Sequence, residues 1–145
     1  MAASQSDIRN LARFRYAIRK FLRFSEESAR KVGLTPQHHQ LLLGVAGFTE
    51  NDSVTIGQLA EFLQVRHHSA VGLVDRAQAM GLVQREANPN DRREVQVSLT
   101  TEGMRKLRTL AALHRSELLR MRRSLDIFRL ERDAAPGAKG KGRPS

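Results

Sequence analysis

The chain has 145 residues, 40% of them hydrophobic, which is long enough for one domain with its own core. Its 25 basic residues exceed its 15 acidic residues, and the resulting charge of +10 favours a polyanionic partner such as nucleic acid over a membrane. The absence of cysteine excludes disulfides and thiolate metal sites but does not identify a compartment, and no apolar run approaches a membrane span. Because the charged N-terminal segment has no signal-peptide core, we expect a cytoplasmic protein.

The first predicted element is a helix that begins after Ser4 or Ser6 and runs to about Lys31. Charged residues occur throughout it, so it has no signal-peptide core. Two neighbouring apolar series follow three-four spacing: Ile8, Leu11, Ile18 and Leu22, and then Phe14, Ala17, Phe21 and Phe24. Such a wide apolar front needs more cover than one small domain provides, so we expect a subunit partner.

Three shorter helices are predicted next. Thr35 as N-cap and Pro36 at the first helical position start one helix, which ends near Gly47. Thr55 and Gln58 have capping-box spacing and start the second. After a turn at residues 64–66, the third helix ends at Gly81, and its predicted inward residues are Val71, Val74, Ala77 and Met80.

The periodicity then changes from 3.6 to 2 residues, which predicts a hairpin. The strands are "LVQRE" and "EVQVSL", with Val95, Val97 and Leu99 facing inward, and "ANPND" has the composition of the turn between them.

A long helix, capped by Thr100, is predicted after the hairpin. Its apolar seam is heptad-like and consists of Met104, Leu107, Ala111, His114, Leu118, Met121, Leu125 and Phe128. Whether Ser124 divides residues 104–132 into two helices stays open. Residues 134–145 are rich in Gly, Pro and Lys and are predicted to be a disordered basic tail.

Helix, tight turn, helix and hairpin together predict a winged helix-turn-helix, in a mainly α fold with a small β-hairpin wing and a helical dimerisation region. In this motif the second helix of the pair enters the DNA major groove with its N-terminal residues. The predicted DNA-binding residues, on this helix, the helix before it and the wing, are Thr55, Arg66, His67, His68, Ser69, Gly72, Arg76, Arg92 and Arg93.

Residues 59–103 resemble the MarR family of bacterial transcriptional regulators. The resemblance rests on "LVDR", "GLV-R", "DRR" at the wing and "LT-EG" at the next helix, in that order. It implies one domain over residues 4–133, with a winged core at about 35–100 and dimerisation helices at about 4–31 and 101–132. It further implies a homodimer that binds a pseudo-palindromic operator, often as a repressor released by a small phenolic or aromatic ligand. The chain has Gln64 where the family often has a turn glycine, and Arg66 where it often has a capping serine.

Several of these residues have a second interpretation. Arg92 and Arg93 are predicted to enter a minor groove, the alternative being a solvated turn. Asp91 is expected to position an arginine by ion pairing, since DNA would repel it. Arg76 and Arg85 can bind phosphate or pair with a nearby acid such as Asp75.

Three further histidines, His38, His39 and His114, are candidates for an effector pocket between the dimerisation and DNA-binding regions, although His114 also suits a hydrogen-bonded core position. A metal-responsive regulator that uses histidine and carboxylate ligands is an alternative, against which no two histidines are spaced i,i+3 or i,i+4. An architectural DNA binder without effector is another alternative. The sequence lacks enzyme motifs and predicts no cofactor and no metal.

Overall fold

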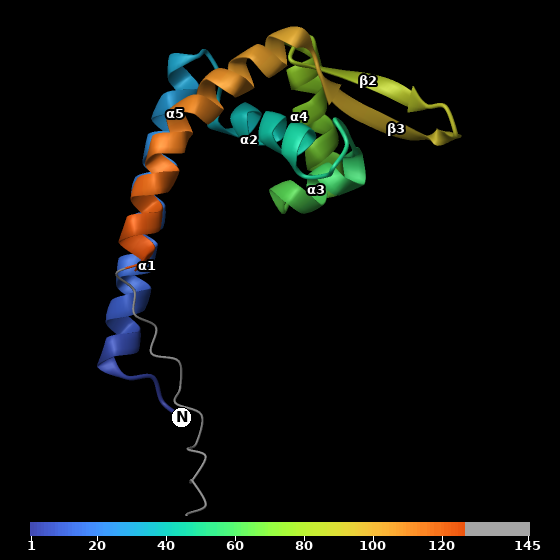
Figure 1. The fold of residues 1–145 in the computed structure, drawn as a ribbon. Coiled ribbons are helices and arrows are strands. Elements are labelled where there is room, and N and C mark those ends of the chain that lie inside the picture. The colour runs from blue at the N-terminus through green and yellow to red at the C-terminus, as the bar shows by residue number, and fades with distance from the viewer. Residues whose placement is uncertain (127–145) are drawn as a thin grey trace, which may run out of the picture.

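The computed structural model describes residues 1–126, except for the side chains of Arg92 and of residues 124–126. This part of the chain is mostly helical, with one small antiparallel sheet, as the sequence predicts (Figure 1). Its elements in chain order are α1 (Gln5–Lys31), α2 (Pro36–Gly47), β1 (Ser53–Thr55), α3 (Ile56–Leu63), α4 (His67–Ala79), β2 (Val83–Asn88), β3 (Asp91–Leu99) and α5 (Thr101–Asp126). No helix within residues 1–126 is long and apolar enough to cross a membrane.

Four of the five described helices, α1, α2, α3 and α5, begin at the residues that the capping signals predict. Ser4 caps α1 in a reciprocal box with Asp7, and Thr35 accepts a hydrogen bond from the backbone of His38 at 3.1 Å. The hydroxyl groups of Thr55 and Thr100 accept hydrogen bonds from the third residue of α3 and of α5, both at 3.1 Å. Each cap satisfies a backbone N–H that has no partner inside its helix, which fixes where the helix begins.

The sheet has three strands in the order β1-β3-β2, one more than the two predicted. β1 pairs antiparallel with β3, and Val54 lies opposite Val97. At three residues, β1 is too short to show an alternating pattern, so periodicity could not reveal it. The hairpin turn is also tighter than predicted, because Asn88 and Asp91 pair with each other at the ends of their strands. β1 therefore ties the hairpin to the segment that enters α3.

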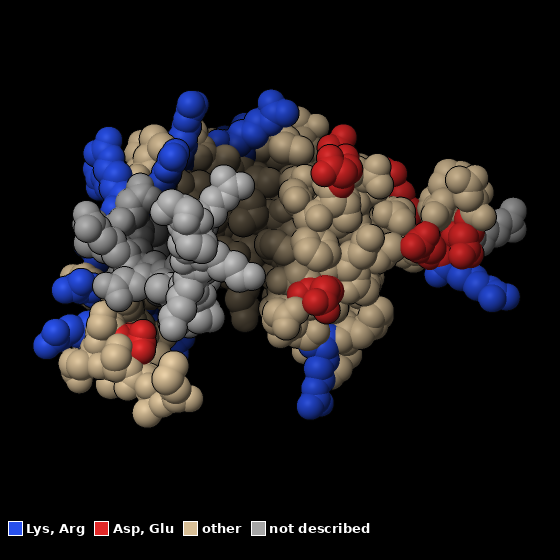
Figure 2. Space-filling model, turned by 60° about the horizontal axis from the view of Figure 1, so that its bottom comes forward, with Lys and Arg blue, Asp and Glu red and all other residues tan. Residues whose placement is uncertain are grey.

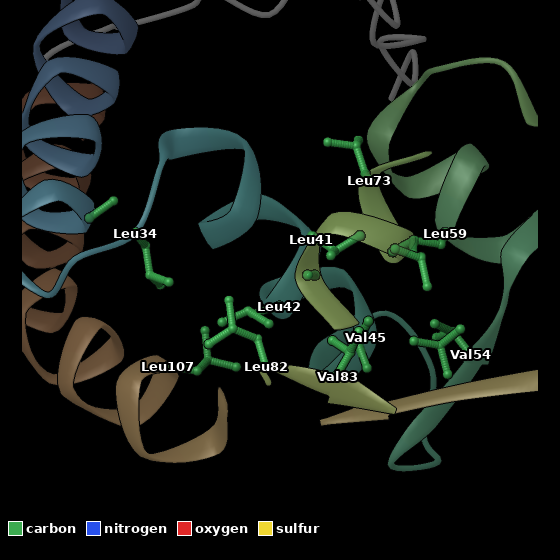
Figure 3. Close-up of a cluster of buried hydrophobic side chains, with 14 of the residues drawn as sticks. Leu34, Leu41, Leu42, Val45, Val54, Leu59, Leu73, Leu82, Val83 and Leu107 are labelled. Carbon is green, nitrogen blue, oxygen red and sulfur yellow. The ribbon is translucent and has the colours of Figure 1, made fainter. Parts of the chain in front are cut away.

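The core lies between α2, the helix pair α3–α4, the sheet and the first turns of α5, and α2 contacts all of these elements (Figure 3). Its fully buried large side chains are Leu41, Leu42, Val45, Val54, Leu59, Val74, Leu82, Val83, Val97 and Leu110.

Some predicted inward positions are wrong. α4 buries Ala70 and Leu73 together with Val74 and Ala77, whereas Val71 is half-buried and Met80, at the C-cap, is exposed. Val95 is also exposed, and it lies on β3 just beyond the residues that pair with β1.

α1 and α5 pack side by side and form a stalk that extends away from the hairpin (Figure 1). The predicted seam of α5 is only partly covered within this chain, since Leu107 and His114 are buried but Ala111 and Leu118 are exposed. α5 runs through Ser124 as one helix to Asp126. Phe128, the rest of residues 127–132 and the predicted tail at 134–145 lie outside the described residues.

The turn between α3 and α4 contains a backbone conformation that is rare for a residue with a side chain. Gln64 has φ 54° and ψ 47°, and among the described residues it is the one non-glycine residue with positive φ. Its side-chain amide donates a hydrogen bond to the carbonyl oxygen of Glu61 at 2.7 Å, which offsets part of the cost of the left-handed region. The structure thus explains why related turns favour glycine here.

We expect Gln64→Gly to raise the free energy of unfolding by about 0.5–1 kcal/mol, because glycine adopts this conformation without steric cost. Gln64→Val should lower it, since a β-branched side chain fits the left-handed region poorly. Urea unfolding of both variants checks the sign, and a destabilised glycine variant would contradict the explanation.

Candidate nucleic-acid interface

The N-terminus of α4 is an exposed helix end without a side-chain cap. Arg66 occupies the N-cap position and makes no capping hydrogen bond, and both His67 and His68 are exposed. The first N–H groups of a helix lack intrahelical partners and carry the positive end of its dipole. Such an end can receive phosphate, while the neighbouring imidazoles can donate to or accept from base edges.

The outward face of α4 continues through Ser69, Gly72 and Arg76, which the three-four spacing places on one side. A Cβ atom added at Gly72 would meet only the guanidinium of Arg76, at 3.6 Å, so the surface there is open. This opening allows the close approach of another backbone, which the sequence led us to expect. Within residues 1–126, the side chain of Arg76 makes no ion pair.

The hairpin tip is held by short-range hydrogen bonds. The carboxylate of Asp91 accepts a hydrogen bond from the backbone N–H of Arg93 at 3.0 Å, and the Asn88 side chain accepts one from the backbone of Asn90 at 2.9 Å. The expected ion pair of Asp91 with an arginine stays a prediction, because the side chain of Arg92 is not described and the contact shown is with the backbone of Arg93. The Arg93 side chain is exposed, whereas that of Arg92 lies outside the described residues.

A polar contact that sequence reasoning left undecided joins the hairpin to α4. Arg85 of β2 donates to the carboxylate of Asp75 at 2.5 Å and also to the side-chain oxygen of Gln78. Arg85 thus forms an ion pair with an acid, and this contact joins the hairpin to α4. The sequence contains both residues, but ten positions separate them, and nothing in their spacing indicates that they pair.

Thr55 lies at the start of α3, and its hydroxyl oxygen is occupied by the capping hydrogen bond from Gln58. Its O–H group keeps one donor, which is what a phosphate contact requires.

The three effector-pocket candidates are buried, and they divide into two groups. His39 and His114 lie with ring centroids 5.1 Å apart, and the rings of Phe21 and Phe24 meet His114 edge-on at 5.9 and 5.3 Å. Nδ1 of His114 lies 2.7 Å from the carbonyl oxygen of Leu110, as predicted for a hydrogen-bonded core histidine. For His38, the neighbour of His39 on α2, the charged side chain that affects the pKa belongs to Arg76 of α4.

Burial lowers the pKa of both α2 histidines. Desolvation is the main cause for His38, assisted by the charge of Arg76, and for His39, assisted by His114. Nδ1 of each ring is buried without a hydrogen-bond partner in the described structure. Neutral imidazole is therefore the form that this fold favours at both positions.

We expect acid to destabilise the fold through these two histidines. Since the folded-state pKa of each lies below its unfolded value of about 6.5, the stability that they contribute is complete above that pH. It is lost as the pH falls from about 6.5 through the lower folded pKa, because the unfolded chain binds the protons more readily. Urea midpoints at pH 7.5 and 5.5 measure the loss.

A matched pair of variants assigns that loss to its source. The double variant His38→Gln, His39→Gln should lose less stability between the two pH values than the parent protein. The exposed pair His67→Gln, His68→Gln should retain the parent's loss. An equal loss in all three proteins would contradict the assignment.

No group of three or more His, Cys, Asp or Glu side chains that could hold a metal ion occurs within residues 1–126. The metal-responsive alternative therefore has no observation in its favour there.

Comparison with known proteins agrees with this geometry. Residues 32–94, which run from the end of α1 into β3, match the model of the MarR family. The chain is 32% identical over 77 residues to the HTH-type transcriptional repressor MdtR of Bacillus subtilis (strain 168). That alignment covers 53% of this chain and 48% of MdtR, so the chain matches about half the length of this relative.

Solved structures share the fold over a longer part of the chain. AbsC, a MarR family transcriptional regulator from Streptomyces coelicolor, superposes with a TM-score of 0.71 at 21% identity, covering 86% of this chain and 84% of its own. A mutant MarR from E. coli complexed with operator DNA superposes with a TM-score of 0.63 at 24% identity, covering 83% and 85%. The match over the winged core and the shared fold that includes the stalk thus make this chain similar to MarR family regulators.

Proposed function

We propose that this protein is a homodimeric, sequence-specific DNA-binding regulator of transcription that acts as a repressor. The observation that carries the proposal is the uncapped N-terminus of α4, where His67 and His68 are exposed on a helix that Arg85 ties to the hairpin. A rigid unit of this kind presents a helix end and a wing to DNA at a fixed separation. The function is binding rather than catalysis, in line with MarR family regulators.

In this proposal the two parts of the unit read different features of the duplex. His67, His68 and Ser69 meet base edges and phosphates in the major groove, and Gly72 allows the DNA to approach closely. Phosphate contacts that fix the register come from the remaining candidates near the groove, Thr55, Arg66 and Arg76. Arg92 and Arg93 enter the adjacent minor groove, where arginine is favoured.

The dimer follows from apolar side chains that this chain leaves uncovered on its stalk. Leu11 of α1 is 63% exposed, and Leu118 and Leu119 of α5 are each 54% exposed. A two-fold axis along the stalk would cover such faces in both subunits and give two α4 helices for two half-sites. Sedimentation at micromolar concentration should show a dimer, and a stable monomer would contradict the proposal.

The repressor role is supported by the likeness to MdtR, whose name describes a transcriptional repressor. We further propose that a small aromatic ligand modulates DNA affinity at the junction of α1, α2 and α5, where His39 and His114 are buried beside phenylalanines. Release of bound operator by a panel of phenolic acids tests the effector. If no compound releases the operator, an effector-independent DNA binder remains.

Selection of genomic fragments by the purified protein tests the proposed function. One or a few fragments with a shared pseudo-palindrome should be enriched, and their affinity should fall steeply with salt through counterion release. Enrichment of no sequence, or an affinity that is indifferent to salt, would contradict sequence-specific DNA binding.

A further inference from the structure

The positive charge of the chain is concentrated outside its winged unit. Residues 32–100, which hold all nine candidate DNA contacts, contain five basic and seven acidic residues. By contrast, α1 contains eight basic and three acidic residues, and α5 contains seven and three. On the face in Figure 2, lysine and arginine gather mainly over the stalk, and most of the visible acidic side chains lie on the winged unit. The stalk thus carries a charge that operator binding by the winged unit does not use.

One row of this charge lies along α1, and we call Arg9, Arg13 and Lys20 the α1 ridge. All three side chains are exposed and lie opposite the buried Ser25 and Ala29 on α1, with Lys20 at the edge of the face that packs on α5. Within residues 1–126, Arg9 and Arg13 make no ion pair, and the ammonium of Lys20 lies 5.4 Å from the centroid of the Tyr16 ring. The ridge cations thus make no ion pair within residues 1–126, although Lys20 shares a pocket between α1 and α5 with Glu117.

The ridge stays accessible in the dimer proposed above. Of the exposed apolar residues of α1, Ile8, Leu11 and Leu22 form the face that a partner stalk would cover in that dimer, whereas Tyr16, 63% exposed, lies beside the ridge. At about 100° per residue, each of the three residues of that face lies about 100° or more around the helix from every residue of the ridge. Dimerisation through the apolar side leaves the ridge on the outside.

The spacing of the ridge suits a chain of phosphates. From Arg9 to Lys20 the helix rises about 16 Å, over which a DNA duplex presents roughly ten phosphate charges. Two of the three side chains are arginines, whose planar guanidinium groups bind phosphate oxygens in pairs. We infer that the α1 ridge binds the phosphodiester backbone of a second DNA duplex while the winged unit holds the operator.

A membrane surface fits the ridge less well. A helix that lies in a membrane inserts an apolar face below its basic residues. The inward apolar face of α1 is already occupied, since Phe21 and Phe24 pack against His114 of α5. The ridge itself offers one aromatic ring, that of Tyr16, and no aliphatic side chain.

The test measures capture of a second duplex by protein that already occupies immobilised operator. The probe is a labelled 30-bp duplex without operator sequence, added at about 50 mM salt. We expect capture by the parent protein and at least a ~10-fold loss in Arg9→Gln, Arg13→Gln, Lys20→Gln. The salt dependence of capture should become shallower by about 2–3 in logarithmic slope, because three phosphate contacts are removed. Operator affinity should stay within about twofold, since the ridge does not belong to that site.

The matched control removes the same charge from the C-terminal segment, as Lys139→Gln, Lys141→Gln, Arg143→Gln, and it should still capture the second duplex.

The inference is overturned if the parent protein captures no second duplex, or if the control loses capture as the ridge variant does. It is also overturned if the ridge variant captures normally or loses operator affinity. Ridge-dependent binding of phosphatidylserine vesicles without duplex capture would assign the ridge to membranes instead. Because operator affinity is measured separately, failure of this inference leaves the proposed function intact.

Discussion

Gly103→Ala should lower the free energy of unfolding by roughly 2–3 kcal/mol, the upper range for overpacking at a closely packed site. A Cβ atom at Gly103 would lie 2.1 Å from the carbonyl oxygen of Leu82 and 3.1 Å from its carbonyl carbon. That oxygen also accepts a hydrogen bond from the backbone of Thr100 at 3.0 Å. The clash is with backbone at the point where α5 meets the winged unit, so a side-chain rotation cannot relieve it.

Gly47→Ala is the matched control, because nothing lies within 4 Å of a Cβ atom added there at the end of α2. Its stability should stay within about 0.5 kcal/mol of the parent protein, as for most exposed substitutions. Thermal and urea unfolding of both variants make the comparison. If Gly103→Ala is no less stable than Gly47→Ala, α5 does not approach Leu82 as closely as the structure has it.

Arg93→Ala should weaken operator binding by about tenfold or more and leave the melting temperature unchanged. The Arg93 side chain is exposed at the hairpin tip, and the hydrogen bond that holds the turn uses its backbone N–H, which alanine retains. The variant therefore loses the guanidinium without losing the turn. Operator titration and thermal unfolding of the same preparation measure the two effects.

Arg115→Ala removes the same charge from an exposed position on α5 and should leave operator affinity within about twofold. The reason is that operator affinity depends on the contact that Arg93 makes with DNA and not on the net charge of the protein. Equal weakening by the two substitutions would point to a general electrostatic effect. Normal binding by Arg93→Ala would show that the wing does not contact DNA.

Helix starts and the helix-turn-helix could be predicted because local chemistry determines them. Thr35 followed by Pro36, and Thr55 three residues before Gln58, satisfy orphan N–H groups whatever the rest of the chain does. The errors arise where long-range packing decides. Periodicity marks Val95 as inward but cannot show that β1 ends before reaching it.

The same limit holds for the candidate interface. The exposed histidines of α4 follow from the position of the turn, which the sequence shows. The contact of Arg85 with Asp75, and that of His39 with His114, join residues on different elements, and local sequence patterns do not reveal such pairs. The hydrogen bond from the backbone of Arg93 to Asp91 is also one that the sequence does not indicate.

Footprinting on the selected operator, with and without five base pairs inserted at its centre, tests the central claim most directly. A homodimer that uses α4 and the hairpin should protect two half-sites whose centres lie about 10 bp apart, one helical turn. The insertion rotates one half-site by about half a turn and should lower affinity at least ~10-fold, because both α4 helices can no longer enter their grooves together. Protection of a single half-site, or binding that the insertion leaves unchanged, would contradict the account.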